Sequence, residues 1–234
     1  MTLLKLLQPT CYALNEGAAI FQVRFETAQF RKHLTKLYRD TYLIPLPSSV
    51  LGFIGAVLGV DRRNLQDFSC KNGVMTGAAM LGYEGLISET MTVVKMKDWR
   101  SFIRTPKRSV LLYRPSYLFA VSSTREVVDE LIHRLQKMDF QYEVFGGNDY
   151  NFLMDVGEVR RAKYVEADSG TGYCRLSEVQ GWKGKGELRV DEVNDGEVSK
   201  YAFSYNLTLK TVRRPAVTDG SVTIFVHESW RFLR

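Results

Sequence analysis

The sequence contains little of what disulfide frameworks, zinc sites and histidine-based active sites require. Only three cysteines and three histidines occur in 234 residues. Cys11, Cys70 and Cys174 are odd in number and widely spaced, and no Cys-x-x-Cys pair is present. This pattern argues against disulfides and zinc and is typical of the reducing cytoplasm. We therefore expect a cytoplasmic protein that has free cysteines, no metal and no other cofactor.

Long apolar segments are also missing. The longest apolar run covers residues 50–60 and is interrupted by glycines, whereas a membrane-spanning helix needs about 20 residues. The first ten residues lack the apolar core and cleavage site of a secretory signal. We expect no membrane partner.

Positive charge is present in excess, and it is concentrated. Residues 24–39 contain five lysines and arginines and one glutamate, and residues 95–114 contain seven and one aspartate. These two segments carry a net charge of +10, so the remaining residues sum to −4 and the chain to +6. Aromatic residues are interleaved in both segments. This combination favours single-stranded nucleic acid as the partner, although a solvated charged face is the simpler alternative for either segment alone.

The first of these segments leads into an unusual helix. Residues 44–47 read Ile-Pro-Leu-Pro and must be extended, because proline fixes φ and cannot donate a backbone hydrogen bond. Ser48 or Ser49 is then expected to cap a helix that begins near Val50. Three glycines follow within eight residues, at 52, 55 and 59. They predict a helix that packs very closely on a sheet or on another backbone.

The order of the remaining patterns predicts an α+β fold. A strand is expected at 19–25, a helix from 50, strands at 86–96 and 110–121, an amphipathic helix capped by Thr124, and a strand at 141–145. This is the ferredoxin-like (RRM-like) order, which many RNA-binding sheets share; an α+β meander with a different strand count is the alternative. Beyond residue 151 five further strands are expected. We therefore predict a ferredoxin-like RNA-binding domain over 1–155 and a smaller β-rich region over 156–234.

A basic hairpin is expected to project from this domain. Residues 98–109 contain four cationic side chains around Trp99 and Phe102. The functional interpretation is a hairpin that grips the sugar–phosphate backbone and stacks an aromatic ring on bases; the alternative is that both rings anchor a loop in the core. The glycine turn at Gly146 and Gly147 is open to two interpretations as well, close approach of a phosphate or a simple tight turn.

Catalytic motifs are scarce. The sequence contains no His-Glu-x-x-His, Walker or paired-carboxylate pattern. His133 is expected to face solvent, and His227 is expected to be structural. His33 could act as a general base towards an RNA 2′-hydroxyl, or it could simply donate to phosphate.

Two stretches resemble the N-terminal signature of the Cas-five (Cas5) family of CRISPR-associated proteins, which are RAMP-type subunits of the type I interference complex Cascade. They read AQFR at 28–31 and TYLIPLPSSVLG at 41–52. The family signature has a Phe-Arg pair, a Thr-Tyr-x-x-Pro-x-Pro-Ser element and a glycine-bearing helix, and all three stand here in order. The resemblance is specific over about 28–60, supportive to about 155 and weak beyond.

The resemblance implies a non-catalytic subunit that caps the 5′ handle of the CRISPR RNA (crRNA) in antiviral defence. It implies a β-hairpin thumb, placed here at about 88–113, that meets a backbone subunit of the Cas-seven type. It also implies contact with the large subunit, and target DNA is a further candidate partner. Charge and resemblance together nominate these RNA-binding residues: Arg24, Arg31, Lys32, Lys36, Arg39, Tyr42, Trp99, Arg100, Arg104, Lys107, Arg108, Gly146, Gly147 and Asn148.

One branch of the family, in type I-C systems, cleaves precursor crRNA without a metal. Such cleavage requires a tyrosine or histidine base and a lysine, and no matching trio can be placed in this chain. We therefore expect no catalytic residue. The alternatives are a metal-independent endoribonuclease that uses His33 and Tyr42, and a scaffold whose basic segments contact proteins.

Overall fold

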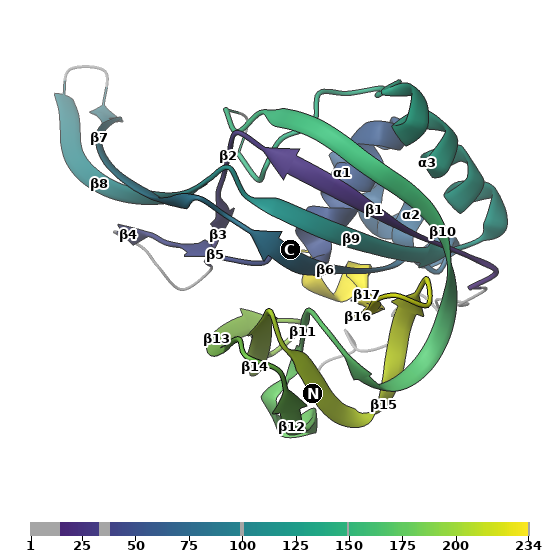
Figure 1. Ribbon diagram of the computed structural model, residues 1–234. Helices are drawn as coiled ribbons and strands as arrows, with labels where there is room; N and C mark the ends of the chain where they lie inside the picture. The colour runs from purple at the N-terminus through teal and green to yellow at the C-terminus, as the bar shows by residue number, and fades with distance from the viewer. Residues whose placement is uncertain (1–14, 33–37, 99–100, 149, 234) are drawn as a thin grey trace, which may run out of the picture.

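The computed structural model describes residues 15–32, 38–98, 101–148 and 150–233, and a large antiparallel sheet forms its centre (Figure 1). The strand order is β12-β15-β10-β1-β9-β6-β17, and β16 pairs with β15. The four strands in the middle are β1 (Gly17–Phe25), β6 (Met75–Gly82), β9 (Ser116–Ser123) and β10 (Leu153–Gly170).

Strand β1 explains why the sheet is covered on both sides. Successive side chains of a strand point to opposite faces. Phe21, Val23 and Phe25 belong to the main core, whereas Ala18 and Ile20 belong to a second apolar cluster on the other face. The sheet is therefore the middle layer of the molecule.

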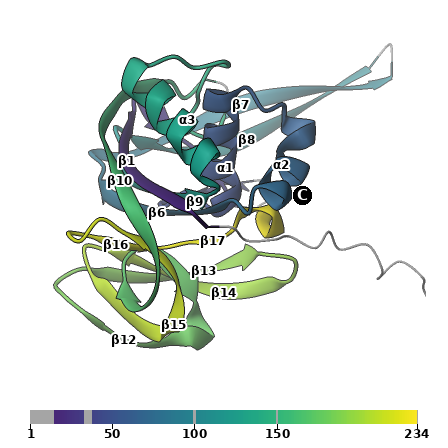
Figure 2. The ribbon, with the colours of Figure 1, turned by 90° about the vertical axis from the view of Figure 1, so that its right-hand side faces the viewer.

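Three helices lie on the face that carries the main core (Figure 2). Helices α1 and α3 contact the sheet, and α2 packs beside α1. The order β1, α1, β6, β9, α3, β10 is the expected strand, helix, strand, strand, helix, strand, and these four strands lie in the order β10-β1-β9-β6. The bounds are α1 (Pro47–Leu58), α2 (Leu65–Lys71), α3 (Arg125–Lys137) and the 3-10 turn η2 (Arg62–Asn64) between the first two.

The residues assigned to two of these strands differ from the prediction. The second strand is β6, not 86–96, which belongs to the hairpin. The fourth is β10, because residues 141–145 form no strand. The amides of Gln141 and Tyr142 instead donate to the carbonyls of Val57 and Ala56 at the end of α1, at 3.4 and 3.0 Å. The last turn of a helix has free carbonyls, and this segment satisfies two of them.

Helix α1 begins earlier than expected and uses its glycines differently. Leu46 is the N-cap residue and Pro47 is the first helical residue, a position where proline loses no hydrogen bond. A side chain at Gly52 would meet nothing within 4 Å, and one at Gly55 would meet Leu65 of α2. Gly59 ends the helix with φ +78°. Helix α1 does pack on the sheet, through β6, as predicted, but Gly52 and Gly55 do not mediate that contact.

The C-terminal half folds back under the central sheet (Figure 1). Strand β10 continues through residue 155, the expected domain boundary, and pairs with both β1 and β15. Near the C-terminus, β17 pairs with β6. The elements of this half are β11 (Tyr173–Arg175), η3 (Leu176–Glu178), β12 (Val179–Lys183), β13 (Glu187–Asn194), β14 (Val198–Tyr205), β15 (Thr208–Thr218), β16 (Thr223–Phe225), β17 (His227–Glu228) and η4 (Ser229–Phe232).

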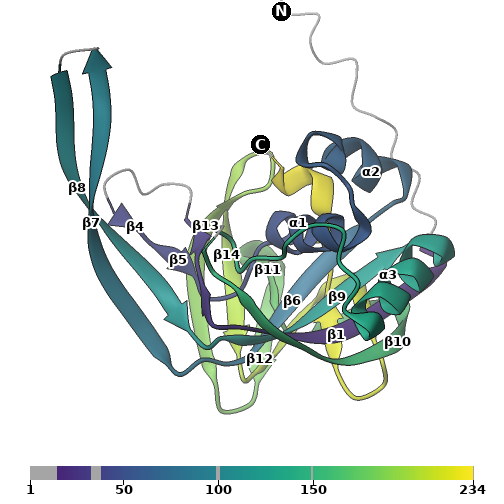
Figure 3. The ribbon, with the colours of Figure 1, turned by 90° about the horizontal axis from the view of Figure 1, so that it is seen from above.

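A long hairpin projects from the body, and the views in Figures 1 and 3 agree on this. It consists of β7 (Gly85–Asp98) and β8 (Ser101–Tyr113), where a hairpin was expected at about 88–113. The strand expected at 110–121 is divided at Arg114, which has φ +46°, and Pro115. Four short strands lie near the hairpin base: β2 (Thr27–Ala28), β3 (Phe30–Arg31), β4 (Tyr38–Arg39) and β5 (Thr41–Tyr42).

The cysteine prediction needs a correction. Cys174 is a buried free thiol, but Cys70 is disulfide-bonded, so the expectation of free cysteines alone was wrong. Cysteines that are far apart in the sequence can lie close together in the fold, so their wide spacing did not exclude a disulfide. No helix in the described part of the chain has the length and apolar character needed to cross a membrane.

Candidate nucleic-acid interface

The two cationic segments meet at the hairpin base. Strand β4 runs parallel to β8, with Tyr38 opposite Arg108 and Arg39 opposite Ser109. The Arg108 guanidinium lies 5.7 Å from the centre of the Tyr38 ring, within the range of a cation–π contact. The two segments therefore meet at the hairpin base.

Gln29 connects this junction to the glycine turn. Its side chain is buried, and its Nε2 atom donates to Ser109 Oγ at 2.5 Å and to the Val110 carbonyl at 3.0 Å. Its Oε1 atom accepts a hydrogen bond from the Asn148 side chain. One buried side-chain amide thus connects the first cationic segment (residues 24–39, the arm), the hairpin and the glycine turn. Sequence reasoning did not select Gln29 as a site residue, although it lies inside the AQFR stretch.

The glycine turn is packed against the protein itself. A side chain at Gly146 would lie 2.8 Å from the carbonyl oxygen of Thr27, and one at Gly147, where φ is +99°, would collide with the carbonyl of Gln29. The backbone N–H of Gln29 also donates to the Gly146 carbonyl at 2.8 Å. The close backbone approach that these glycines permit is therefore internal, which favours the simple structural turn. Asn148 likewise holds Gln29 in place.

Tyr42 lies in the core rather than on the surface. It is 1% exposed, its hydroxyl donates to the Glu192 carbonyl at 2.6 Å, and its ring stacks on Phe203 with centroids 5.9 Å apart. Tyr42 was predicted to bind RNA; in the structure it fastens the arm to the β13–β14 sheet. Its place in the Thr-Tyr-x-x-Pro-x-Pro element reflects packing.

Lys32 is tied to two carboxylates. Its Nζ atom lies 2.6 Å from Asp191 Oδ1 and 3.3 Å from Asp40 Oδ2. Partial burial lowers the pKa of the Lys32 ammonium, but hydrogen bonds and charge from Asp191 and Asp40 outweigh it and raise the pKa above its ordinary value. The ammonium is fully charged at neutral pH, and its charge is partly neutralised by these aspartates.

The remaining arm residues differ in exposure. Arg31 is exposed and pairs through its backbone with Thr41. Arg39 is partly buried at the junction, and Arg24 forms an exposed ion pair with Asp155 at 2.5 Å. Lys36 and His33 lie outside the described residues. Among the described candidates, Arg31 is the arm residue best placed to meet a ligand.

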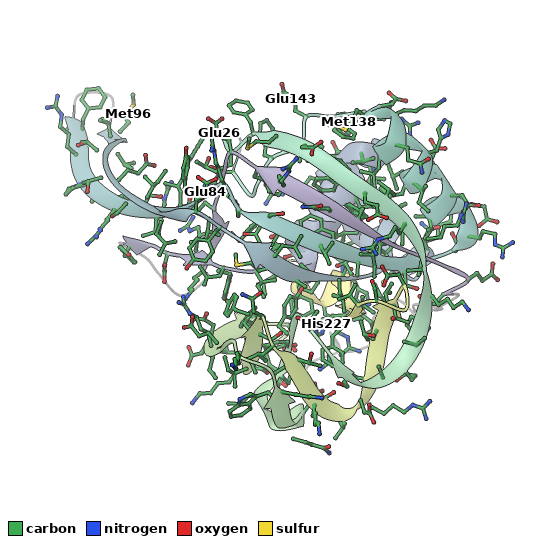
Figure 4. The ribbon with its side chains drawn as sticks, viewed as in Figure 1. Glu26, Glu84, Met96, Met138, Glu143 and His227 are labelled. Atoms are coloured by element: carbon green, nitrogen blue, oxygen red, sulfur yellow. The ribbon has the colours of Figure 1, made fainter. Side chains whose placement is uncertain are left out.

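The hairpin presents cations and apolar side chains together. Arg104 and Arg108 are exposed, and their register positions opposite Val94 and Thr90 put them on the same face of the hairpin. Four apolar side chains are also exposed towards the tip, and Figure 4 shows Met96 there, far from the body. They are Val94, Met96, Phe102 and Ile103. Lys107 lies on β8, whereas Trp99 and Arg100 fall outside the described residues.

A small cleft opens beside this junction, between the arm, the hairpin base and β13. Its volume is about 260 Å³. Sequence reasoning missed the contribution of β13, because nothing in the sequence indicates that this strand returns to the arm. The cleft is lined by Lys32, Asp40, Thr41, Leu43, Leu86, Val110, Arg189, Val190 and Asp191.

The two described histidines lie away from the junction. His133 is exposed on α3, as expected. His227 is buried in the body, as Figure 4 shows, and stacks on Tyr173 with centroids 5.0 Å apart. Arg214 Nη2 donates to its Nδ1 at 3.2 Å, so its Nε2 carries the proton and donates to the Tyr173 carbonyl at 3.1 Å. Within the described residues, no group of three or more His, Cys, Asp or Glu side chains could hold a metal ion.

The family model described as CRISPR-associated protein (Cas_Cas5) matches residues 19–190, which include the arm, the hairpin and the first half of β13. The chain belongs to the Cas5 family. The resemblance seen in the two N-terminal stretches is thereby confirmed, and the match extends well beyond them. As a member of this family, the protein has a CRISPR-associated role. No curated protein matches the chain closely enough to count as a relative.

The chain also aligns with chains of solved structures. A crystal structure of a Cas protein aligns at 16% identity and a TM-score of 0.42, covering 83% of this chain and 95% of that one. A chain of a CRISPR RNA-guided surveillance complex aligns at 14% identity with a TM-score of 0.46. The alignment covers 84% of this chain and 90% of that one. A chain of a Type III-B Cmr-beta complex bound to cognate target RNA aligns at 10% identity with a TM-score of 0.39. The alignment covers 82% of this chain and 86% of that one.

Proposed function

We propose that this Cas5 protein is a non-catalytic, RNA-binding subunit of a type I Cascade complex that holds the 5′ handle of crRNA in antiviral defence. The observation that carries the proposal is the junction of β4 and β8, which unites two cationic segments separated by more than 50 residues. Exposed guanidinium groups on both segments can neutralise phosphates of one strand, and exposed Phe102 can stack on a base.

The fold supports this function. We infer that β1, α1, β6, β9, α3 and β10 form a ferredoxin-like (RRM-like) domain of the RAMP type, because their chain order and the sheet order β10-β1-β9-β6 agree with it. The hairpin is then the thumb. Its apolar tip suits a protein partner, for which we propose a backbone subunit of the Cas-seven type. The large subunit and target DNA are further proposed partners, and the cytoplasm is the proposed compartment.

RNA binding tests the proposal directly. A chain that neutralises about six phosphates of a single strand should show a slope near −4 in a plot of log affinity against log salt concentration. Arg31→Ala should weaken binding of a repeat-derived 5′ handle RNA, whereas Arg125→Ala on the distant helix α3 should not. Affinity that does not respond to salt would reject the proposal, and unchanged affinity in the Arg31 variant would remove that residue from the site.

The alternative proposal is a metal-independent endoribonuclease, and the position of Tyr42 argues against it. Of its two suggested groups, His33 lies outside the described residues, and the Tyr42 hydroxyl is buried and bonded to a backbone carbonyl. Incubation of the purified protein with precursor RNA in EDTA decides the question, because cleavage under those conditions requires no divalent metal. Intact RNA eliminates the nuclease. A freshly isolated protein with an absorbance ratio typical of free protein would instead favour a scaffold that contacts only proteins.

A further inference from the structure

The cleft at the junction has apolar walls that come from distant parts of the chain. Leu86 at the hairpin base is 54% exposed, and Val190 on β13 is 48% exposed. Val110 and Leu43 complete the apolar lining. Both Figure 1 and Figure 3 place β13 beside β5 and the hairpin base, and the Lys32–Asp191 ion pair fixes that arrangement. Aliphatic side chains on two sides of a narrow opening suit a flat ring.

The size of the cleft limits what can enter. Sites for drug-sized ligands usually measure about 300–1,000 Å³, and this cleft measures about 260 Å³. It accommodates a single small planar group and is too small for the side chains of a docked helix.

The polar groups of the cleft are not equivalent. Asp40 already uses both oxygens, because Oδ1 accepts the Thr41 amide at 2.9 Å and Oδ2 faces Lys32. Asp191 meets the Lys32 ammonium through Oδ1. A carboxylate has two oxygens and about four lone-pair positions, so Asp191 retains capacity to accept two parallel N–H groups.

We propose that this cleft binds one unpaired guanine base of the bound RNA, with Asp191 accepting the N1–H and N2–H groups of the base and the positive charge of Lys32 lying beside its O6. The proposal rests on the proposed function, because it assumes that the strand held by the hairpin and the arm is RNA. It adds base specificity to an interface that otherwise contacts only phosphates and ring faces.

Only guanine matches this arrangement of one carboxylate beside one ammonium. Its Watson–Crick edge has two adjacent donors followed by an acceptor, which is the complement of Asp191 and Lys32. Adenine and cytosine each offer the carboxylate one amino group and an acceptor nitrogen whose lone pair it repels. Uracil offers a single N–H flanked by two carbonyl oxygens. Single-stranded bases are commonly read along this edge.

The test uses the full-length protein and labelled oligouridine of about 12 nucleotides that contains one central guanosine, inosine or adenosine. Inosine keeps N1–H and O6 but lacks the N2 amino group. Wild-type protein should bind the guanosine probe about 5- to 150-fold more tightly than the adenosine probe, with the inosine probe in between. Asp191→Asn should abolish this preference.

Glu192→Gln is the matched control. It removes the same charge from the neighbouring residue of β13, which is exposed and is not among the residues that line the cleft. This variant should keep the preference for guanosine. Equal wild-type affinity for all three probes, with normal salt-dependent binding, would overturn the guanine site and leave the proposed function intact. Wild-type discrimination decides the matter even if Asp191→Asn does not fold. Failure of every probe to bind would overturn both proposals.

Discussion

At the scale of single residues, we expect the buried polar side chains to affect the free energy of unfolding most. His227 illustrates this. Burial lowers the pKa of the His227 imidazole well below its ordinary value, and the Arg214 guanidinium lowers it further. The ring is therefore neutral in the folded protein, where it accepts from Arg214 and donates to Tyr173.

A pH dependence of stability follows from His227. In the unfolded chain this histidine binds a proton near pH 6.5, whereas in the folded protein it does so only at lower pH. The unfolded state therefore binds more protons in this window. The contribution of His227 is complete above pH 6.5 and is lost by up to about 1.4 kcal/mol per pH unit as the pH falls below it. Urea denaturation between pH 8 and pH 5 measures this slope. His227→Gln, which keeps a donor and an acceptor, should flatten it, and exposed His133→Gln should not; identical slopes in both variants would contradict this account.

Gly147 provides a second test at this scale. Alanine there would have to adopt φ +99° and would collide with the Gln29 carbonyl. Gly147→Ala should lower the free energy of unfolding by about 1–3 kcal/mol or more. Gly181→Ala is the control, because a side chain at that position meets nothing within 4 Å. Thermal or urea denaturation of the two variants compares them, and equal stability would show that the turn has room to move.

At the scale of elements, the β7–β8 hairpin combines a buried base with an exposed outer part. Val110, Leu111 and Leu112 are buried near the body, whereas Phe102, Ile103 and Arg104 are exposed. Charge and aromatic residues predicted a hairpin at 98–109, and the family resemblance extended it to about 88–113, close to the observed β7 and β8. Sequence patterns did not locate β6 or β10 as the second and fourth strands of the sheet. The glycine-rich 75–82 segment has weak strand propensity, and only its burial between β9 and β17 makes it a strand.

The division of roles in the hairpin predicts that its outer part can be removed. Replacing residues 92–105 with a short glycine turn should leave the free energy of unfolding within about 0.5 kcal/mol of wild type, because the described side chains there are mostly exposed. RNA binding should weaken and become less dependent on salt, since Arg104 and its neighbours are removed while Arg31 and Arg108 remain. Urea denaturation and RNA titration of the same sample separate the two effects. A large loss of stability would show that the outer hairpin belongs to the core.

At the scale of the whole molecule, the two regions expected from the sequence share structure. Strand β10 crosses residue 155, β17 returns to β6, and η4 contacts α1. Composition and strand patterns correctly indicated a β-rich second half, but strand pairing across more than 100 residues leaves no local signal. The charge of the two basic segments predicted a polyanionic partner, but neither their pairing through β4 and β8 nor the contribution of Asp191 to the same site leaves a signal in the sequence.

This connectivity predicts a single unfolding transition. Phe232 is 4% exposed, and its ring lies edge-on to Tyr201 of β14 with centroids 6.2 Å apart, on a turn that also packs on α1. Phe232→Ala should lower the free energy of unfolding by about 3–5 kcal/mol. In wild type and in Phe232→Ala alike, the unfolding curve measured by far-ultraviolet circular dichroism should coincide with the curve measured by tryptophan fluorescence. Two separated transitions would mean that residues 1–155 and 156–234 fold independently.

The central claim is that the arm and the hairpin grip one strand of RNA together, and the salt dependence of RNA affinity tests it most directly. Wild-type protein should give a log–log slope near −4. Arg31→Gln combined with Arg108→Gln should bring it to about −2.6, since each phosphate contact on a single strand contributes about 0.7. Arg125→Gln combined with Lys137→Gln removes the same charge from α3 and should leave the slope unchanged. A wild-type slope near zero, or equal slopes in the two double variants, would contradict the account.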